Sequence, residues 1–165
     1  MARALIVGCG CRGQELGKRL LDAGWRVRGT TRDPGATEDI LAARLEAVVA
    51  DPERALSILD QIGDVTLVFW LLGSALGEPE QIAAIHGSRL ERLLERLVDT
   101  PVRGFVYEGA GRVQRERLER GGQIAREAQK RWQIPVEVVD EDPGDWEAWT
   151  GAMLGAAERL TASLE

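Results

Sequence analysis

Short apolar runs alternate with longer stretches of mixed polarity along almost the whole chain. The first run, Ala4-Leu5-Ile6-Val7, ends at a glycine, and the longest, residues 65–72, carries no charge. Short apolar runs bounded by turn residues are typical of buried strands. We therefore expect strands at residues 4–7, 25–31, 47–49, 65–72, 102–107 and 135–139.

The intervening stretches carry apolar residues three or four positions apart, the spacing that gathers them on one face of a helix. The clearest is residues 79–98, in which Ile82, Ile85 and Leu90 begin a single stripe. In residues 114–132 the pair Gly121-Gly122 is a candidate break. Helices are expected at residues 13–23, 40–45, 53–62, 79–98, 114–132 and 145–164.

This order of elements predicts the fold class. Strands that alternate with helices form a parallel sheet with helices on both faces, so we expect an α/β, doubly wound sheet of about six strands. The run at residues 65–72 suits a central strand, because central strands of parallel sheets are buried on both faces. A length of 165 residues fits one domain, here residues 1–165.

Composition narrows the functional classes. The chain has 21 basic and 27 acidic residues and a net charge of −6, so it lacks the basic field that nucleic-acid binding needs. The longest uncharged stretch, residues 65–77, is too short to span a bilayer, which argues against a membrane protein. Two cysteines one residue apart form no disulfide framework, and no signal peptide is recognisable, so a reducing cytoplasm is expected.

The strongest motif is the glycine loop Gly8-Cys9-Gly10-Cys11-Arg12-Gly13. It follows the first expected strand and opens the first expected helix, which is the context of a dinucleotide-binding fingerprint in a Rossmann domain. Gly8 permits the tight turn, Gly10 lets the backbone approach the pyrophosphate, and Gly13 lets the helix pack on the strand. The alternative is a glycine-rich turn that binds no ligand.

The end of the second strand selects the cofactor. An acidic residue there binds the ribose 2′-hydroxyl of NAD, whereas a basic one accommodates the 2′-phosphate of NADP. The chain reads Thr31-Arg32 at this point, with no acid before Asp33, and Arg12 in the glycine loop is a second candidate for the phosphate. NADP is therefore favoured over NAD, although both arginines could instead be solvated.

Residues 4–34 resemble the opening of extended and atypical short-chain dehydrogenase/reductases, the NAD-dependent epimerase/dehydratase group. Residues 46–51 resemble that family's third strand, and the resemblance implies that Asp51 lies against the adenine. Residues 102–107 resemble its fifth strand. The resemblance also places the end of the fourth strand, Leu72 and Gly73, near the nicotinamide.

The chain departs from this family at its catalytic residues. The family uses a tyrosine and a lysine four residues later, on the helix after the fifth strand. Here the only tyrosine, Tyr107, lies within that strand, and Arg126 stands four residues before Lys130. The chain also has a single helix where extended members carry a substrate-binding region. We therefore expect a truncated cofactor-binding or sensor module without the standard catalytic pair.

Two other functions stay open. One is an NADPH-dependent oxidoreductase or epimerase with a non-standard acid such as Glu108, which ends the fifth strand, where these folds bind ligands. The residue type favours a solvated or arginine-paired glutamate instead. The other is a Rossmann-shaped interaction protein that binds no cofactor.

The other residues that could have a function are better explained by a structural role. His86 lies on the inward stripe of the long helix and is expected to be a core histidine, and Trp70 is expected to pack in the core. A redox role for Cys9 and Cys11 is disfavoured, and the chain shows no convincing metal site. Trp146 and Trp149 share a helix face and are expected to cap the sheet edge or bury against the main core, with a homodimer interface as the alternative.

Overall fold

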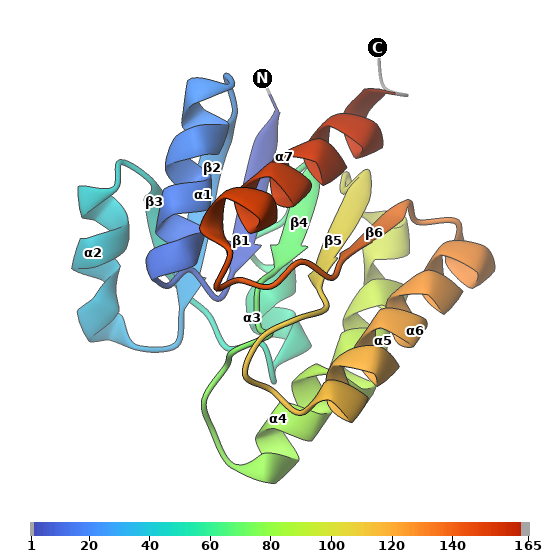
Figure 1. Ribbon diagram of the computed structural model, residues 1–165. Helices are drawn as coiled ribbons and strands as arrows, with labels where there is room; N and C mark the ends of the chain where they lie inside the picture. Colours follow the sequence, from blue (N-terminus) through green and yellow to red (C-terminus); the bar gives the residue numbers. More distant parts are fainter. Residues whose placement is uncertain (1, 163–165) are drawn as a thin grey trace.

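The computed structural model describes residues 2–162 and contains a six-stranded sheet (Figure 1). All strands are parallel, in the order β3-β2-β1-β4-β5-β6. The strands are β1 Arg3–Val7, β2 Arg26–Thr31, β3 Glu46–Val49, β4 Leu67–Trp70, β5 Gly104–Glu108 and β6 Val136–Val139. The helices are α1 Cys11–Asp22, α2 Thr37–Ala42, α3 Ala55–Leu59, α4 Pro79–Ile85, α5 Ser88–Arg96, α6 Arg115–Trp132 and α7 Trp146–Ala162, with short 3₁₀ turns at Pro34–Ala36 and Leu97–Asp99.

Two hydrophobic cores, one on each face, hold the helices to the sheet. Helices α3, α4, α5 and α6 bury their apolar sides on one face, and α1, α2 and α7 cover the other (Figure 1). The central strand β4 is buried at every position, as its apolar sequence predicts. The predicted fold class, a doubly wound α/β sheet, is therefore confirmed.

The strand order places a crevice at the middle of the sheet. Strand β1 pairs with β2 on one side and with β4 on the other. The helix after β1 covers one face and the helices after β4 cover the other, so the chain diverges where these two strands end. Doubly wound folds bind ligands at this switch point, outside the carboxyl ends of the strands.

The prediction of one continuous helix at residues 79–98 is wrong. This segment is divided into α4 and α5 at His86 and Gly87, although its apolar stripe continues across the division. The side chain of His86 is buried and bonded through both ring nitrogens, which fixes the backbone at this point. At Gly87 a Cβ atom would lie 2.7 Å from the carbonyl oxygen of Ala83, so only glycine fits.

The candidate break in α6 is also wrong, because the helix runs continuously through Gly121 and Gly122. Both glycines are buried against the sheet. A Cβ atom at Gly121 would overlap the hydroxyl group of Tyr107. The two glycines therefore allow close packing of α6 on β5 rather than a bend.

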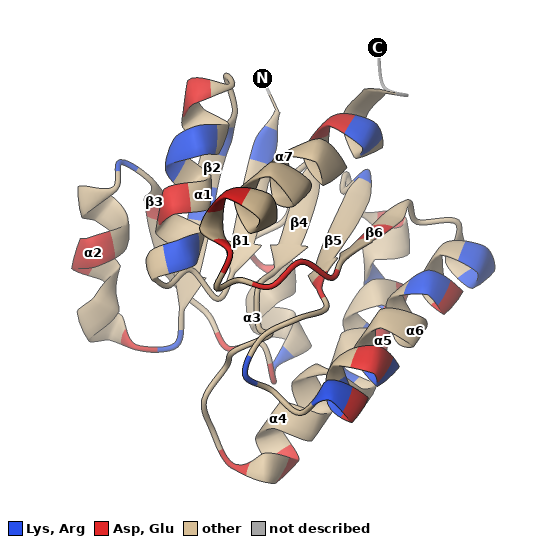
Figure 2. Ribbon diagram, in the orientation of Figure 1, with Lys and Arg blue, Asp and Glu red and all other residues tan. Residues whose placement is uncertain are grey.

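Charged residues lie mainly on the outer sides of the helices and in the loops (Figure 2). An acidic segment, residues 140–145, connects β6 to α7 and passes in front of the sheet in this view. None of the helices formed by residues 2–162 combines the length and the apolar character needed to cross a bilayer.

Candidate functional site

A cleft of about 830 Å³ runs along the carboxyl ends of the central strands. Its walls come from the loops after β1, β2, β3 and β4, from α4, and from single residues of β5 and α7. The volume lies within the range of small-molecule and cofactor sites. The predicted site residues that line it are Gly8, Gly10, Cys11, Arg12, Gly13, Thr31, Arg32, Leu72 and Glu108.

The glycine loop joins β1 to α1, and its three glycines meet different constraints. Gly8 has a φ of +86°, and a Cβ atom there would lie 2.5 Å from the carbonyl oxygen of Leu71. Gly13 packs closely on β1, where a Cβ atom would lie 3.2 Å from a methyl group of Ile6. Around Gly10 no atom lies within 4 Å of an added Cβ, so its surface is open to the cleft.

The first turn of α1 offers free amide groups to a ligand. Gly10 is the N-cap, it supplies no side-chain cap, and the first turn contains no acidic residue. The first N–H groups of a helix have no partner within the helix, and the helix dipole adds a partial positive charge there. This arrangement suits an anion such as a pyrophosphate. The cleft therefore combines the volume of a cofactor site with an uncapped helix N-terminus that suits a phosphate group.

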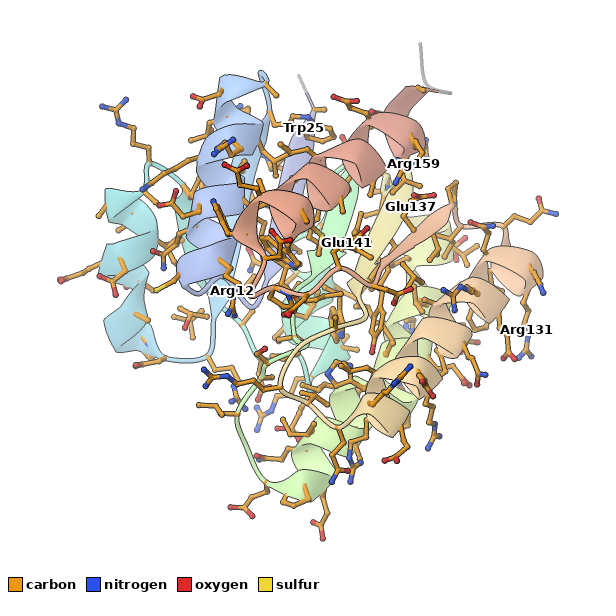
Figure 3. All side chains as sticks on the ribbon, in the orientation of Figure 1. Arg12, Trp25, Arg131, Glu137, Glu141 and Arg159 are labelled. Carbon is orange, nitrogen blue, oxygen red and sulfur yellow. The ribbon has the colours of Figure 1, made fainter. Side chains whose placement is uncertain are left out.

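The end of β2 supports the loop and adds a cation to the cleft. The carbonyl oxygen of Thr30 accepts a hydrogen bond of 2.9 Å from the backbone N–H of Cys9. The guanidinium of Arg32 is exposed and donates to the carbonyl oxygen of Leu76, 2.9 Å away in the loop after β4. Arg12 is exposed at the start of α1 (Figure 3). Arg12 and Arg32 thus lie on the same cleft, on two different elements.

Two predicted cofactor residues lie beside the cleft rather than among its lining residues. The carboxylate of Asp51 accepts a hydrogen bond of 3.0 Å from the backbone N–H of Glu53, while its neighbours Ala50 and Pro52 form the wall. Gly73 is buried behind Leu72, and a Cβ atom there would overlap the carbonyl oxygen of Ala110. The loops after β4 and β5 therefore pack against each other.

Glu108 is buried at the end of β5, with 4% of its surface exposed. Its Oε1 accepts a hydrogen bond of 2.8 Å from the N–H of Gly73, and its Oε2 accepts one of 2.9 Å from the indole N–H of Trp149. The expectation of a solvated or arginine-paired glutamate is therefore wrong. Burial raises the pKa of this carboxyl group, and its two hydrogen bonds and the charge of Arg12 oppose that rise.

Sequence reasoning missed the link between Trp149 and Glu108. Trp149 is fully buried and stacks on Trp146 with ring centroids 5.7 Å apart, and Trp146 packs against the same core, so the prediction of burial against the main core is confirmed. The tryptophan spacing indicated a shared helix face but gave no sign of a polar partner. The indole of Trp149 joins α7 to the wall of the cleft.

The other candidates are structural. His86 is buried and bonded through both ring nitrogens, as expected for a core histidine, and burial lowers its pKa. Trp70 is buried in the core and donates to the carbonyl oxygen of Ile85, 3.1 Å away. Burial raises the pKa of Cys9 to about 12, which disfavours a reactive thiolate there. Among residues 2–162 no three His, Cys, Asp or Glu side chains form a group that could hold a metal ion.

Comparison with known proteins supports the fold. The chain superimposes on UDP-glucuronic acid 4-epimerase from Bacillus cereus in complex with NAD, with a TM-score of 0.61 and 17% identity over 82% of this chain and 54% of that chain. A short-chain dehydrogenase/reductase superfamily protein from Agrobacterium tumefaciens with bound NAD gives a TM-score of 0.66 and 20% identity over 82% and 48%. The chain has the fold of these epimerases and dehydrogenases.

The chain spans about half the length of these two structures. Against BdcA (YjgI) from E. coli it gives a TM-score of 0.76 and 16% identity over 94% of this chain and 90% of that chain. No protein-family model matches the sequence, and no curated protein matches it. The resemblance noted in the sequence is thus confirmed for the fold.

Proposed function

We propose that this chain binds a nicotinamide adenine dinucleotide in the cleft. One observation carries the proposal: the glycine loop leaves the N-terminus of α1 open and uncapped at the switch point of the sheet. Backbone N–H groups and the helix dipole bind phosphates at such positions. Two of the solved structures with the same fold hold NAD, which supports this class of ligand.

The preferred cofactor in this proposal is NADP. Arg12 and Arg32 lie on the same cleft, and the acidic residue nearest the end of β2, Asp33, uses Oδ1 to accept the N–H of Gly35 at 2.8 Å. Guanidinium groups pair bidentately with phosphate oxygens, so these arginines suit the 2′-phosphate. A preference for NAD would instead place the ribose 2′-hydroxyl against Asp33, which also lines the cleft.

We further propose that the protein lacks the standard catalytic pair of the family it resembles. A bound nicotinamide supplies hydride chemistry, and the family's tyrosine and lysine handle the proton. The helix after β5 presents Gly121, Gly122, Ala125 and Ala128 to the sheet, and the hydroxyl group of Tyr107 bonds to His86 in the core. A homodimer, a cytoplasmic location and the absence of nucleic-acid binding stay predictions.

Titration with NADPH, NADP, NADH and NAD tests the proposal, by calorimetry and by quenching of tryptophan fluorescence. Trp149 lines the cleft, so its emission should report binding. Micromolar binding with NADP(H) preferred is the expected result. No binding at millimolar concentration would overturn the proposal and favour an interaction protein without a cofactor.

A matched pair of variants locates the binding site. Gly10→Val puts a side chain into the open space before the first turn of α1 and should abolish binding. Gly63→Val is the control, because Gly63 also has nothing within 4 Å of an added Cβ and lies outside the cleft lining. Unchanged affinity in Gly10→Val would show that the glycine loop is only a turn.

A further inference from the structure

The wall of the cleft contains one deeply buried carboxyl group. Asp33, Asp39 and Glu53 also line the cleft, but they are half-buried or exposed. Glu108 is 4% exposed and sits at the carboxyl end of β5, between the loop after β4 and helix α7. Of these four carboxyl groups, only Glu108 is buried deeply enough for burial to favour its neutral form strongly.

The surroundings of Glu108 accept either protonation state. Each carboxyl oxygen receives one N–H group, from Gly73 or from Trp149. A carboxylate offers about four lone-pair sites, so a proton can be added without breaking either bond. Glu108 can therefore gain or lose a proton without any rearrangement of the residues around it.

Few charges act on Glu108. Arg12, from the first turn of α1, favours the ionised form. On the β6 side, Asp140 lies against Gly109, and burial, followed by the charges of Glu108 and Asp140, raises the pKa of Tyr107, the residue before Glu108. From α7 and from the loop after β4 the facing groups are the neutral indole of Trp149 and the backbone of Gly73. Arg12 is thus the cation that holds Glu108 toward its charged form.

We propose that Glu108 takes up a proton when the dinucleotide binds and holds it as the proton donor of the cleft, for a substrate that contains a carbonyl group. This inference rests on the proposed function. Phosphates at the glycine loop would pair with Arg12, add negative charge to the cleft and displace its water. All three effects favour the neutral carboxyl group.

The proton has a defined use. Reduction of a carbonyl adds a hydride to carbon and a proton to oxygen, and the reduced nicotinamide would supply only the hydride and would itself be oxidised. Glu108 gives its proton to the oxygen and is left as a carboxylate, so the product is an alcohol and charge is conserved. The open cleft then returns a proton to Glu108 from water.

Calorimetry measures this proton directly, without a substrate. NADH is the probe, because it lacks the 2′-phosphate that itself titrates near neutral pH. Binding is measured in two buffers of different ionisation enthalpy, from slightly acidic to slightly alkaline pH. The native protein should take up as much as one proton per NADH. In the pH range where this uptake occurs, its affinity for NADH should weaken by up to about tenfold for each unit that the pH rises.

Glu108→Gln should bind NADH without proton uptake and without this pH dependence. Glu127→Gln, which changes an exposed carboxylate on α6, is the control and should behave like the native protein. Equal uptake in Glu108→Gln and the native protein would overturn the inference while leaving the proposed function intact. Absence of binding of both NADH and NADPH to the native protein would instead contradict the proposed function itself.

A second variant keeps the test informative if Glu108→Gln does not fold. Trp149→Phe removes one N–H donor from Glu108 while keeping an aromatic ring in the same place. The ionised form loses a partner, so the pH range of proton uptake should move upward. An unchanged range in Trp149→Phe would count against Glu108 as the group that takes up the proton.

Discussion

The hydroxyl group of Tyr107 donates a hydrogen bond to Nδ1 of His86, 2.6 Å away, and Nε2 of His86 donates to the carbonyl oxygen of Leu72, 2.8 Å away. A carbonyl can only accept, so Nε2 is assigned a proton, and burial, which lowers the pKa of His86, favours the neutral ring whose Nδ1 accepts from Tyr107. The chain has one tyrosine and one histidine, and each is committed to the other inside the core. Neither is free to act in the cleft.

Stability should depend on pH through His86. Burial lowers the pKa of its imidazole below the ordinary value of 6.5. The unfolded chain therefore binds a proton that the folded chain does not, and the free energy of unfolding should fall as pH drops below about 6.5. Urea unfolding over this range, compared with His86→Gln, measures the effect. An identical slope in the two proteins would contradict it, because the other acidic groups are common to both.

Gly121 and Tyr107 should show strong energetic coupling. Gly121→Ala forces a methyl group against the tyrosine hydroxyl and should destabilise the fold by about 1–3 kcal/mol. Tyr107→Phe leaves Nδ1 of His86 without its donor and should cost about 1–3 kcal/mol. In the double variant the alanine should cost less than it does alone, but not zero, because the ring carbons of residue 107 also approach position 121. Strict additivity in chemical denaturation would disprove the contact.

Gly8 and Gly10 should respond differently to alanine. At Gly8 the positive φ and the approach to Leu71 predict a loss of about 1–3 kcal/mol in the free energy of unfolding. Gly10 has a φ of −83° and open space around it, so Gly10→Ala should change stability by less than about 0.5 kcal/mol. Equilibrium unfolding of the two variants separates the conformational role of one glycine from the ligand-related role of the other. Equal losses would show that the loop geometry is not as described.

Arg32 should discriminate between the two cofactors. Arg32→Ala removes a guanidinium that the 2′-phosphate of NADP can engage, so NADP affinity should fall about tenfold while NAD affinity stays unchanged. The variant also removes the bond to the carbonyl oxygen of Leu76, and any loss from this change would appear equally in both affinities and cancel in their ratio. Parallel calorimetric titrations give the ratio of the two affinities. A ratio equal to that of the native protein would remove the argument for NADP.

The sequence predicted the sheet and the glycine loop because both depend on local patterns. Apolar runs locate the strands, and the run at residues 65–72 marked the central strand, although β4 itself covers only Leu67–Trp70. Glycine spacing located the turn at the end of β1, where Gly8 and Gly13 meet the packing constraints expected of them, while the approach of a pyrophosphate to Gly10 stays a prediction.

Features that depend on contacts between distant residues were not predictable. The break between α4 and α5 follows from hydrogen bonds of His86 to Tyr107 and Leu72, whereas the apolar stripe continues across it. The burial of Glu108 depends on Trp149, which lies 41 positions later in the chain. The spacing of apolar residues around His86 or Glu108 does not indicate which distant residue each of them contacts.

The bond between Trp149 and Glu108 also bears on how the protein is made. Strand β5 leaves the ribosome well before α7, so a growing chain carries Glu108 before the indole that completes its surroundings exists. Until α7 has emerged and folded back, Oε2 of Glu108 lacks its donor and one wall of the cleft is missing. A dinucleotide can therefore meet a finished binding site only after translation has passed residue 149.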